Sequence, residues 1–325
     1  MNRIKVSVII PVYNVEQFIQ RCAKSLFEQT TKNDIEFIFI NDFSSDKSIE
    51  ILNDTLKKYP HRIKQTKIFN LSSNVGASSC RNYGLNHANG DFIIFCDSDD
   101  WVDFNTYEEL YNKATQENAD IVCCDFYDEF TNKHVIRKQP FAEQPETGIK
   151  DMLTTKLHSS TCNKLVKHSL YKESNITFLD GINMWEDLYT SIRLFFYAKK
   201  IAYVPLPLYH YNQQNTGSLL SNITLKKMQE RITICNKLDV FFKSQNCYKK
   251  YQNELYQREL WAKMEFVTDF QIRDFDYWRK LWPKSQEQIK TSTFSIFNKI
   301  VFSLVSNRYD KIAKIFLYIK RAIQH

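Results

Sequence analysis

Short apolar runs alternate with amphipathic segments in the first part of the chain. The apolar runs lack the polar alternation of a half-exposed strand, so they predict buried strands, which we expect at residues 5–12, 35–40, 63–70, 92–96 and 120–126. Between them, apolar residues recur three and four positions apart, which predicts helices at residues 15–29, 46–59, 76–89 and 104–117. Strands that alternate with helices predict an α/β fold, in which a mainly parallel sheet is covered by helices on both faces.

The helical period dominates the second part of the chain. A helix is expected at residues 185–199, followed by a short strand at 201–204 that stops before Pro205. Beyond Thr224 the pattern predicts four helices, at residues 225–244, 248–275, 294–305 and 311–323.

The charge distribution changes near the same point. Residues 222–325 hold 20 Lys and Arg against 10 Asp and Glu, whereas the first 221 residues hold 24 against 27. We therefore expect an α/β domain at residues 1–220 and a basic helical region at residues 221–325.

Composition excludes several classes of protein. The eight Cys form no CxxC pair, which argues against a zinc ribbon and a thioredoxin-like site. No apolar run approaches the roughly 20 residues of a membrane-spanning helix. The N-terminal residues lack the pattern of a secretory signal. These features predict a cytoplasmic protein with reduced thiols.

Three carboxylates follow the predicted strand at 92–96. Asp97, Asp99 and Asp100 are so close in sequence that their charges repel one another unless a cation lies between them. A divalent ion such as Mg²⁺ suits oxygen ligands and often bridges carboxylates to substrate phosphates. The alternative is a solvated acidic turn that caps the next helix.

Polar residues also follow the other predicted strands, at the edge where open α/β sheets bind ligands. Asp42 could accept a hydrogen bond from a nucleobase, or it could serve a turn that caps a helix. Arg81 offers a planar fork of donors that suits diphosphate oxygens, although an ordinary surface arginine fits the same pattern. The glycine patterns of dinucleotide-binding folds and P-loops are absent from the sequence, which argues against both classes.

Two later segments add candidate groups. Glu186 and Asp187 begin a predicted helix, where the helix dipole favours acidic residues, and a carboxylate there could instead act as a general base. His210 lies between two tyrosines and is a candidate substrate or metal contact, although a lone histidine more often has a structural role.

Taken in order, these segments resemble family 2 glycosyltransferases over about residues 4–215. The resemblance rests on residues 7–14, 41–46, 74–76, 81–85, 90–91 and 97–100. Residues 162–165 and 185–188 resemble two later motifs of the bacterial capsule, exopolysaccharide and O-antigen branch. The resemblance implies a GT-A fold and an inverting transfer from a nucleotide-diphosphate sugar to a hydroxyl of a glycan or lipid-linked glycan. The donor expected first is a UDP-sugar.

The resemblance also implies roles for individual residues. The nucleotide-sugar contacts would be Pro11, Tyr13, Glu16, Asp42, Arg81, Asp97 and Asp99. Asp99 or Asp100 would hold a Mg²⁺ or Mn²⁺ ion, and Asp187 would be the catalytic base. Glu186 and His210 stay weaker site candidates on their own sequence patterns, apart from the resemblance. One departure is Phe43, which stands where the family usually has a turn glycine.

The last predicted helices combine lysines and arginines with apolar residues at helical spacing. The apolar set is Phe297, Ile300, Val301, Leu304, Ile312, Ile315, Phe316 and Ile319. One interpretation is a peripheral contact of residues 294–323 with the anionic inner face of the cytoplasmic membrane, which would suit a lipid-linked acceptor. The other is that these helices pack on the catalytic domain or on a second copy. No recognised nucleic-acid-binding module accompanies the charge, so no nucleic-acid partner is expected.

Two other functions compete with sugar transfer. A protein could keep the nucleotide-sugar pocket without turnover, but the intact acidic turn and Asp187 argue against this. A nucleotidyltransferase could be built on a similar sheet, but the order of the motifs disfavours it.

Overall fold

A computed structural model of the chain describes residues 4–31, 34–141, 144–215 and 224–324. It divides the chain into two compact units. The first comprises residues 1–149 and 158–221, and the second comprises residues 150–157 and 222–325. The second unit is therefore assembled from two separate segments of the chain.

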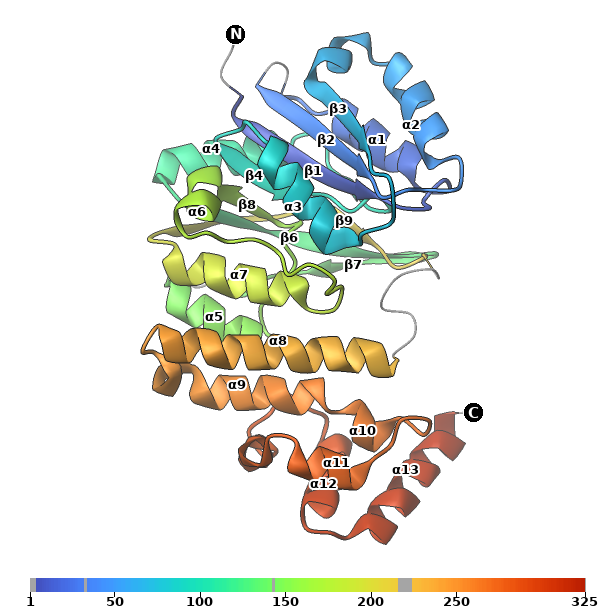
Figure 1. Cartoon of the computed structure of the whole chain (residues 1–325), viewed down its shortest axis with the longest axis vertical. Coiled ribbons are helices and arrows are strands. Elements are labelled where there is room, and N and C mark those ends of the chain that lie inside the picture. The colour runs from blue at the N-terminus through green and yellow to red at the C-terminus, as the bar shows by residue number, and fades with distance from the viewer. Residues whose placement is uncertain (1–3, 32–33, 142–143, 216–223, 325) are drawn as a thin grey trace. The chain divides into compact units, whose positions relative to one another are not determined.

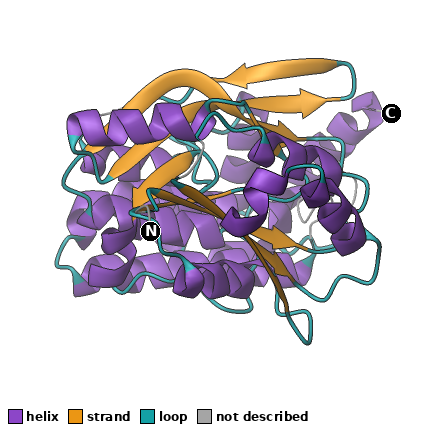
Figure 2. Ribbon diagram, turned by 90° about the horizontal axis from the view of Figure 1, so that it is seen from above, coloured by secondary structure: helices purple, strands orange, loops and turns teal. Residues whose placement is uncertain are grey.

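The first unit contains one mixed sheet. Its strands are β1 (Val6–Val12), β2 (Ile35–Asn41), β3 (Thr66–Asn70), β4 (Phe92–Phe95), β5 (Trp101–Val102), β6 (Ile121–Phe130), β7 (Lys133–Arg137), β8 (Lys164–Lys167) and β9 (Ile201–Asn212). Their order is β3-β2-β1-β4-β8-β6-β9-β5, and β7 pairs with β6 (Figure 1). Figure 2 shows the strands and helices of the chain from above. The pairs β1–β2, β1–β4, β2–β3 and β6–β9 are parallel, and the remaining pairs are antiparallel.

Helices cover both faces of this sheet, as the sequence predicts. They are α1 (Ile19–Phe27), α2 (Ser48–Lys57), η1 (Pro60–Gln65), α3 (Ala77–His87), α4 (Thr106–Glu117), α6 (His168–Glu173) and α7 (Glu186–Tyr197), while α5 (Pro145–Leu153) runs into the second unit. Phe27 of α1 packs against Phe37 and Phe39 of β2. Gly84 of α3 instead lies against Ile9 of β1, so closely that a Cβ atom there would overlap it.

These two contacts identify opposite faces. Ile9 pairs with Ile38, which lies between the two phenylalanines on β2, and successive side chains of a strand alternate between faces. Helices α1 and α3 therefore pack on opposite faces, as Figure 1 shows. Because β1, β2 and β4 are parallel, their carboxyl ends meet at one edge of the sheet. The polar segments that follow them, at residues 13–16, 42–46 and 97–100, lie at this edge.

Strand β9 is longer than the predicted strand at 201–204. It continues through Pro205 and Pro207 to Asn212, and the pairing with β6 shifts register between Cys124 and Phe126. A β-bulge tolerates proline because it relaxes the hydrogen-bonded ladder locally. The stop predicted at Pro205 is therefore wrong, and residues 208–212 reach the acidic turn.

The second unit is helical. Its elements are α8 (Leu225–Ser244), α9 (Tyr248–Ala262), α10 (Glu265–Thr268), α11 (Phe275–Lys280), η2 (Pro283–Gln288), α12 (Ile296–Ser306) and α13 (Asp310–Gln324). The single helix predicted at 248–275 is wrong, because α9 ends at Ala262. The next residue, Lys263, is fully buried and donates hydrogen bonds to the carbonyl oxygens of Trp278, Leu281 and Trp282. These bonds hold the following chain in a fold-back, which a continuous helix would not allow. No helix within the described residues is long and apolar enough to cross a bilayer.

Candidate active site

Asp42 follows β2 and anchors the loop before α3. Its carboxylate accepts hydrogen bonds from the backbone N–H groups of Val75 (2.6 Å) and Gly76 (2.9 Å), and the side chain is buried. Gly76 has a φ of 87°, in the left-handed region that glycine adopts most easily. In this structure the carboxylate of Asp42 therefore fixes the loop before α3, whereas a ligand contact was expected for this residue.

The segment after β1 lies beside the segment after β2. Glu16 accepts a hydrogen bond from the backbone N–H of Lys47 at 3.0 Å, and Ser44 accepts one from the N–H of Asn14. Pro11 lies within β1, opposite Ile40. Tyr13 projects its ring outward and is 49% exposed, so it is accessible to a ligand.

Arg81 of α3 connects two groups of carboxylates. One guanidinium nitrogen lies 2.8 Å from Oε1 of Glu186, and another lies 2.9 Å from Oδ1 of Asp97. Burial acts to lower the pKa of Arg81, but Asp97 and Glu186 together raise it, so the guanidinium stays charged. Burial raises the pKa of Glu186 to about 7, against the opposing effect of Arg81. Sequence analysis placed these residues in separate segments, and the fold brings them together.

The acidic turn after β4 contains three carboxylates in different surroundings. Asp97 is partly exposed and meets Arg81. Asp99 accepts a hydrogen bond from the side-chain amide of Asn215 at 2.8 Å. Asp100 is buried, and its carboxylate accepts hydrogen bonds from the hydroxyl of Tyr209 and from the backbone N–H of Asn212.

Burial and mutual repulsion act on two of these carboxylates. Burial and the neighbouring Asp97 raise the pKa of Asp99. Burial, Asp99 and Asp97 raise the pKa of Asp100 further. Burial and the like charges of the turn thus both favour the neutral form of these two carboxyl groups. No cluster of three or more His, Cys, Asp or Glu side chains in the described part of the chain already has the geometry of a metal site.

Asp187 lies in the first turn of α7, next to Glu186. Its Oδ1 accepts a hydrogen bond from the N–H of Leu188 at 2.7 Å, and its Oδ2 accepts one from the hydroxyl of Ser159 at 3.3 Å. The backbone carbonyl of Ser159 in turn accepts a hydrogen bond from the hydroxyl of Ser191, also on α7. The loop that carries Ser159 is thus fixed to the same helix as Asp187.

Lys164 holds this loop from within the protein. Its ammonium is buried and donates to the carbonyl oxygens of His158 (2.7 Å) and Ser160 (2.6 Å) and to Oδ1 of Asn163 (3.0 Å). Burial lowers the pKa of Lys164. Lys164, in the motif at residues 162–165, therefore fixes the backbone of the loop beside Asp187.

Both ring nitrogens and both ring faces of His210 contact other residues of the protein. Its two ring nitrogens lie 2.7 Å from Glu129 and 3.0 Å from Asp103. The ring is stacked between Trp101 (5.0 Å between centroids) and Tyr127 (4.7 Å). This arrangement matches the structural alternative for His210.

The contributions of Tyr209, Asn212 and Ser159 were not evident from the sequence. The first two lie in the segment that drew attention to His210, and alternation along a strand was a usable signal, because Tyr209 and His210 must point to opposite faces. Ser159 lies in a segment without a clear hydrophobic period, so no comparable signal marked it.

Comparison with known proteins identifies the family. The sequence model described as "Glycosyl transferase family 2" matches residues 7–174. The chain is 32% identical over 257 residues to EpsH of Bacillus subtilis, covering 77% of this chain and 72% of that protein. It is 32% identical over 275 residues to the cholesterol galactosyltransferase of Borreliella burgdorferi, covering 79% of this chain and 74% of that protein. The chain belongs to glycosyl transferase family 2, and it is a glycosyltransferase.

A longer relative and a solved structure extend this result. The chain is 33% identical over 220 residues to the poly(ribitol-phosphate) beta-glucosyltransferase of Bacillus spizizenii, covering 67% of this chain and 33% of that protein. The crystal structure of residues 1–349 of Staphylococcus aureus TarS, in complex with UDP-GlcNAc, matches with a TM-score of 0.70 and 18% identity, covering 99% of this chain and 92% of that one. This likeness confirms the GT-A fold with a helical C-terminal region.

Proposed function

We propose that Asp187 is the catalytic base of an inverting sugar transfer and that the acidic turn at 97–100 lies at the diphosphate of the donor. Arg81 carries this proposal, because one guanidinium contacts both Glu186, the neighbour of Asp187, and Asp97. In this reaction the base takes the proton of the acceptor hydroxyl as its oxygen attacks the anomeric carbon. The bond from that carbon to the diphosphate breaks in the same step, and a single displacement inverts the configuration.

A Mg²⁺ or Mn²⁺ ion fits this turn. We assign it to Asp99, with Asp97 beside it, because the carboxylate of Asp99 meets a neutral amide, that of Asn215, and because burial and the neighbouring Asp97 raise its pKa. Asp100, the other residue that the sequence offered, already directs its carboxylate at Tyr209 and Asn212, so it shapes the turn instead. A divalent ion would neutralise the charge that develops on the departing diphosphate.

The nucleotide belongs at the neighbouring edge of the sheet. Pro11, Tyr13 and Glu16 border this edge, and the exposed ring of Tyr13 offers a face on which a base can stack. Asp42 contributes through the loop at Val75 and Gly76. A UDP-sugar is the first donor to test, since TarS binds UDP-GlcNAc on the same fold.

The acceptor is a glycan or a lipid-linked glycan of a bacterial surface polysaccharide. Relatives named for poly(ribitol-phosphate) and for cholesterol support this class, since the first name is that of a polymer and the second that of a lipid. A lipid-linked acceptor places the reaction at the inner face of the cytoplasmic membrane, with residues 294–323 as the peripheral contact.

The substitution Asp187→Asn tests the base. UDP-, GDP- and dTDP-sugars are first screened, each with Mn²⁺ or Mg²⁺, for the one that raises the melting temperature of the protein. With that donor, Asp187→Asn should lower the release of nucleoside diphosphate by about 10²- to 10⁴-fold, because general base catalysis contributes that much. The donor-dependent rise in melting temperature should be unchanged.

Asp54→Asn is the matched control, since Asp54 is an exposed residue of α2. It should release nucleoside diphosphate at the wild-type rate. Undiminished release by Asp187→Asn would refute the assignment, and a loss confined to Glu186→Gln would transfer the role of base to Glu186.

A further inference from the structure

Helix α13 presents a row of apolar residues to solvent. Ile312, Ile315 and Ile319 are spaced three and four positions apart, so they lie on one side of the helix, and all three are exposed (57% for Ile315). Another side of α13 buries Ala313 and Leu317 in the core of the second unit. A helix on the surface of a protein normally turns polar residues outward, so this row suits a partner that is itself apolar.

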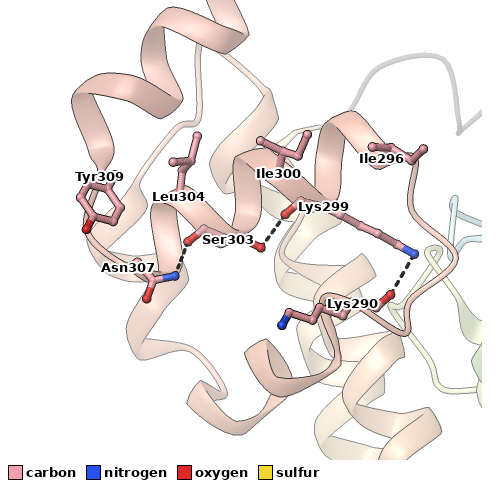
Figure 3. A pocket seen from close by; sticks show the side chains of 8 residues that line it. All are labelled: Lys290, Ile296, Lys299, Ile300, Ser303, Leu304, Asn307 and Tyr309. Atoms are coloured by element: carbon pink, nitrogen blue, oxygen red, sulfur yellow. Dashed lines mark hydrogen bonds between the residues drawn. The ribbon is translucent and has the colours of Figure 1, made fainter.

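Helix α12 adds an apolar hollow of about 430 Å³. Figure 3 shows three of its residues, Ile296, Ile300 and Leu304, in a row along the helix. Tyr309 also lines the hollow and directly precedes α13 in the sequence. The remaining lining residues are Lys290, Lys299, Ser303 and Asn307.

Positive charge surrounds these apolar residues. Residues 290–324 contain seven Lys and Arg but only one acidic residue, Asp310, whose carboxylate is paired with Arg279. Lys299 lines the hollow, and Lys311 is exposed beside the row on α13. Two copies of this surface would repel each other, whereas an anionic surface would attract it. Long lysine side chains can also reach polar headgroups while their stems remain on apolar material.

We propose that the α12–α13 surface, residues 296–319, docks on a bilayer that contains anionic lipids. The exposed isoleucines enter the boundary between headgroups and acyl chains, and the lysines meet the headgroups. This deepens the membrane location that accompanies the proposed function, since it names the exposed isoleucines and the hollow that would make the contact. It does not depend on sugar transfer, because docking needs neither donor nor acceptor.

Sedimentation of the full chain with vesicles tests the proposal. Vesicles of phosphatidylcholine alone are compared with vesicles that also contain phosphatidylglycerol, without nucleotide. Binding should need phosphatidylglycerol, and raising the salt concentration should weaken it, since salt screens the attraction between lysines and headgroups.

Two pairs of variants then separate this surface from the rest of the protein. Ile315→Asp should weaken vesicle binding at least tenfold, whereas Val240→Asp, which changes an equally exposed apolar residue of α8, should leave it unchanged. Lys311→Glu should weaken binding several-fold, whereas Lys249→Glu on α9 should not. All four positions are exposed, so the urea midpoint of each variant should match that of the wild type.

Several outcomes would overturn the proposal. These are no binding to either vesicle, equal binding by Ile315→Asp, or binding that ignores lipid charge. A dimer without lipid that Ile315→Asp dissociates would assign the surface to a second copy instead. Nucleoside diphosphate release by Ile315→Asp keeps the two proposals distinguishable, because loss of docking with normal release bears on the membrane surface alone.

Discussion

In the first unit charged side chains gather inside the protein, whereas in the second unit the unusual surface is apolar and faces solvent. Arg81, Glu186 and Asp100 are buried near the carboxyl edge of the sheet, where Arg81 contacts both Glu186 and Asp97. The second unit also buries charge, but Lys263 lies under the end of helix α11, where it meets backbone carbonyl groups. Its isoleucines on α13 are exposed instead.

This difference separates two kinds of function. Buried charge is costly unless it is paired, so carboxylates that remain only partly compensated indicate chemistry at that position. Exposed apolar residues are costly in water, so a continuous row of them indicates a surface that another body covers. This contrast supports our proposals that catalysis belongs to the first unit and attachment to the second.

The largest expected effect comes from removing a buried arginine of each unit. Arg81→Leu leaves two carboxylates, Glu186 and Asp97, without their cation, and it should lower the free energy of unfolding by about 3–5 kcal/mol. Arg231→Leu breaks the buried pair with Glu265 in the second unit and should cost a similar amount. Urea denaturation measures both.

Activity then distinguishes the two arginines. Below the temperature at which either variant unfolds, Arg231→Leu should release nucleoside diphosphate at close to the wild-type rate, whereas Arg81→Leu should not. Equal activity of the two variants would contradict the comparison. Buried charge in the first unit would then be no more closely linked to catalysis than buried charge in the second unit.

One buried lysine of each unit provides a second test, with a smaller expected effect on stability. Lys164→Met and Lys263→Met each remove the hydrogen bonds that a buried ammonium donates to three acceptors, and each should lower the free energy of unfolding by about 1–3 kcal/mol. Only Lys164→Met should also lower kcat, because its loop carries Ser159 to Asp187. The opposite pattern, a lower kcat in Lys263→Met alone, would contradict the proposed positioning role of Lys164.

Local pattern was sufficient for much of this fold. The mainly apolar runs at β1, β2 and β4 correspond to strands, and the predicted bounds of α8 agree with the structure. Pattern failed where distant residues decide the backbone. The end of α9 depends on carbonyl groups about 15 residues beyond Lys263.

The candidate site was predictable to the same extent. The sequence identified the acidic turn and the segment after β2, because polar residues after parallel strands share one edge of the sheet. It did not show that Asp99 and Asp100 have different hydrogen-bond partners, or which groups Asp42 contacts. Those orientations depend on Tyr209, Asn212 and the N–H groups of the loop before α3, which are distant in sequence.

The smallest expected effect concerns Phe43, an exposed apolar residue of the first unit that could weaken the contrast between the units. Phe43 has a φ of 61°, a left-handed conformation that favours glycine, and its ring is 57% exposed at the sheet edge. Phe43→Gly relieves that strain but gains backbone freedom in the unfolded state, so the free energy of unfolding should rise by no more than about 1 kcal/mol. Strain retained with an exposed ring is typical of a ligand site, so we expect the variant to bind UDP several-fold more weakly, as calorimetric titration would show.

Phe104→Gly is the control, since Phe104 is also exposed but not left-handed, and it should leave UDP binding unchanged. If Phe43→Gly binds UDP as tightly as the wild type, an exposed apolar side chain in the first unit has no ligand to explain it. Exposure alone would then be weaker support for the lipid surface of the second unit, which would have to rest on the continuity of its row and on its charge.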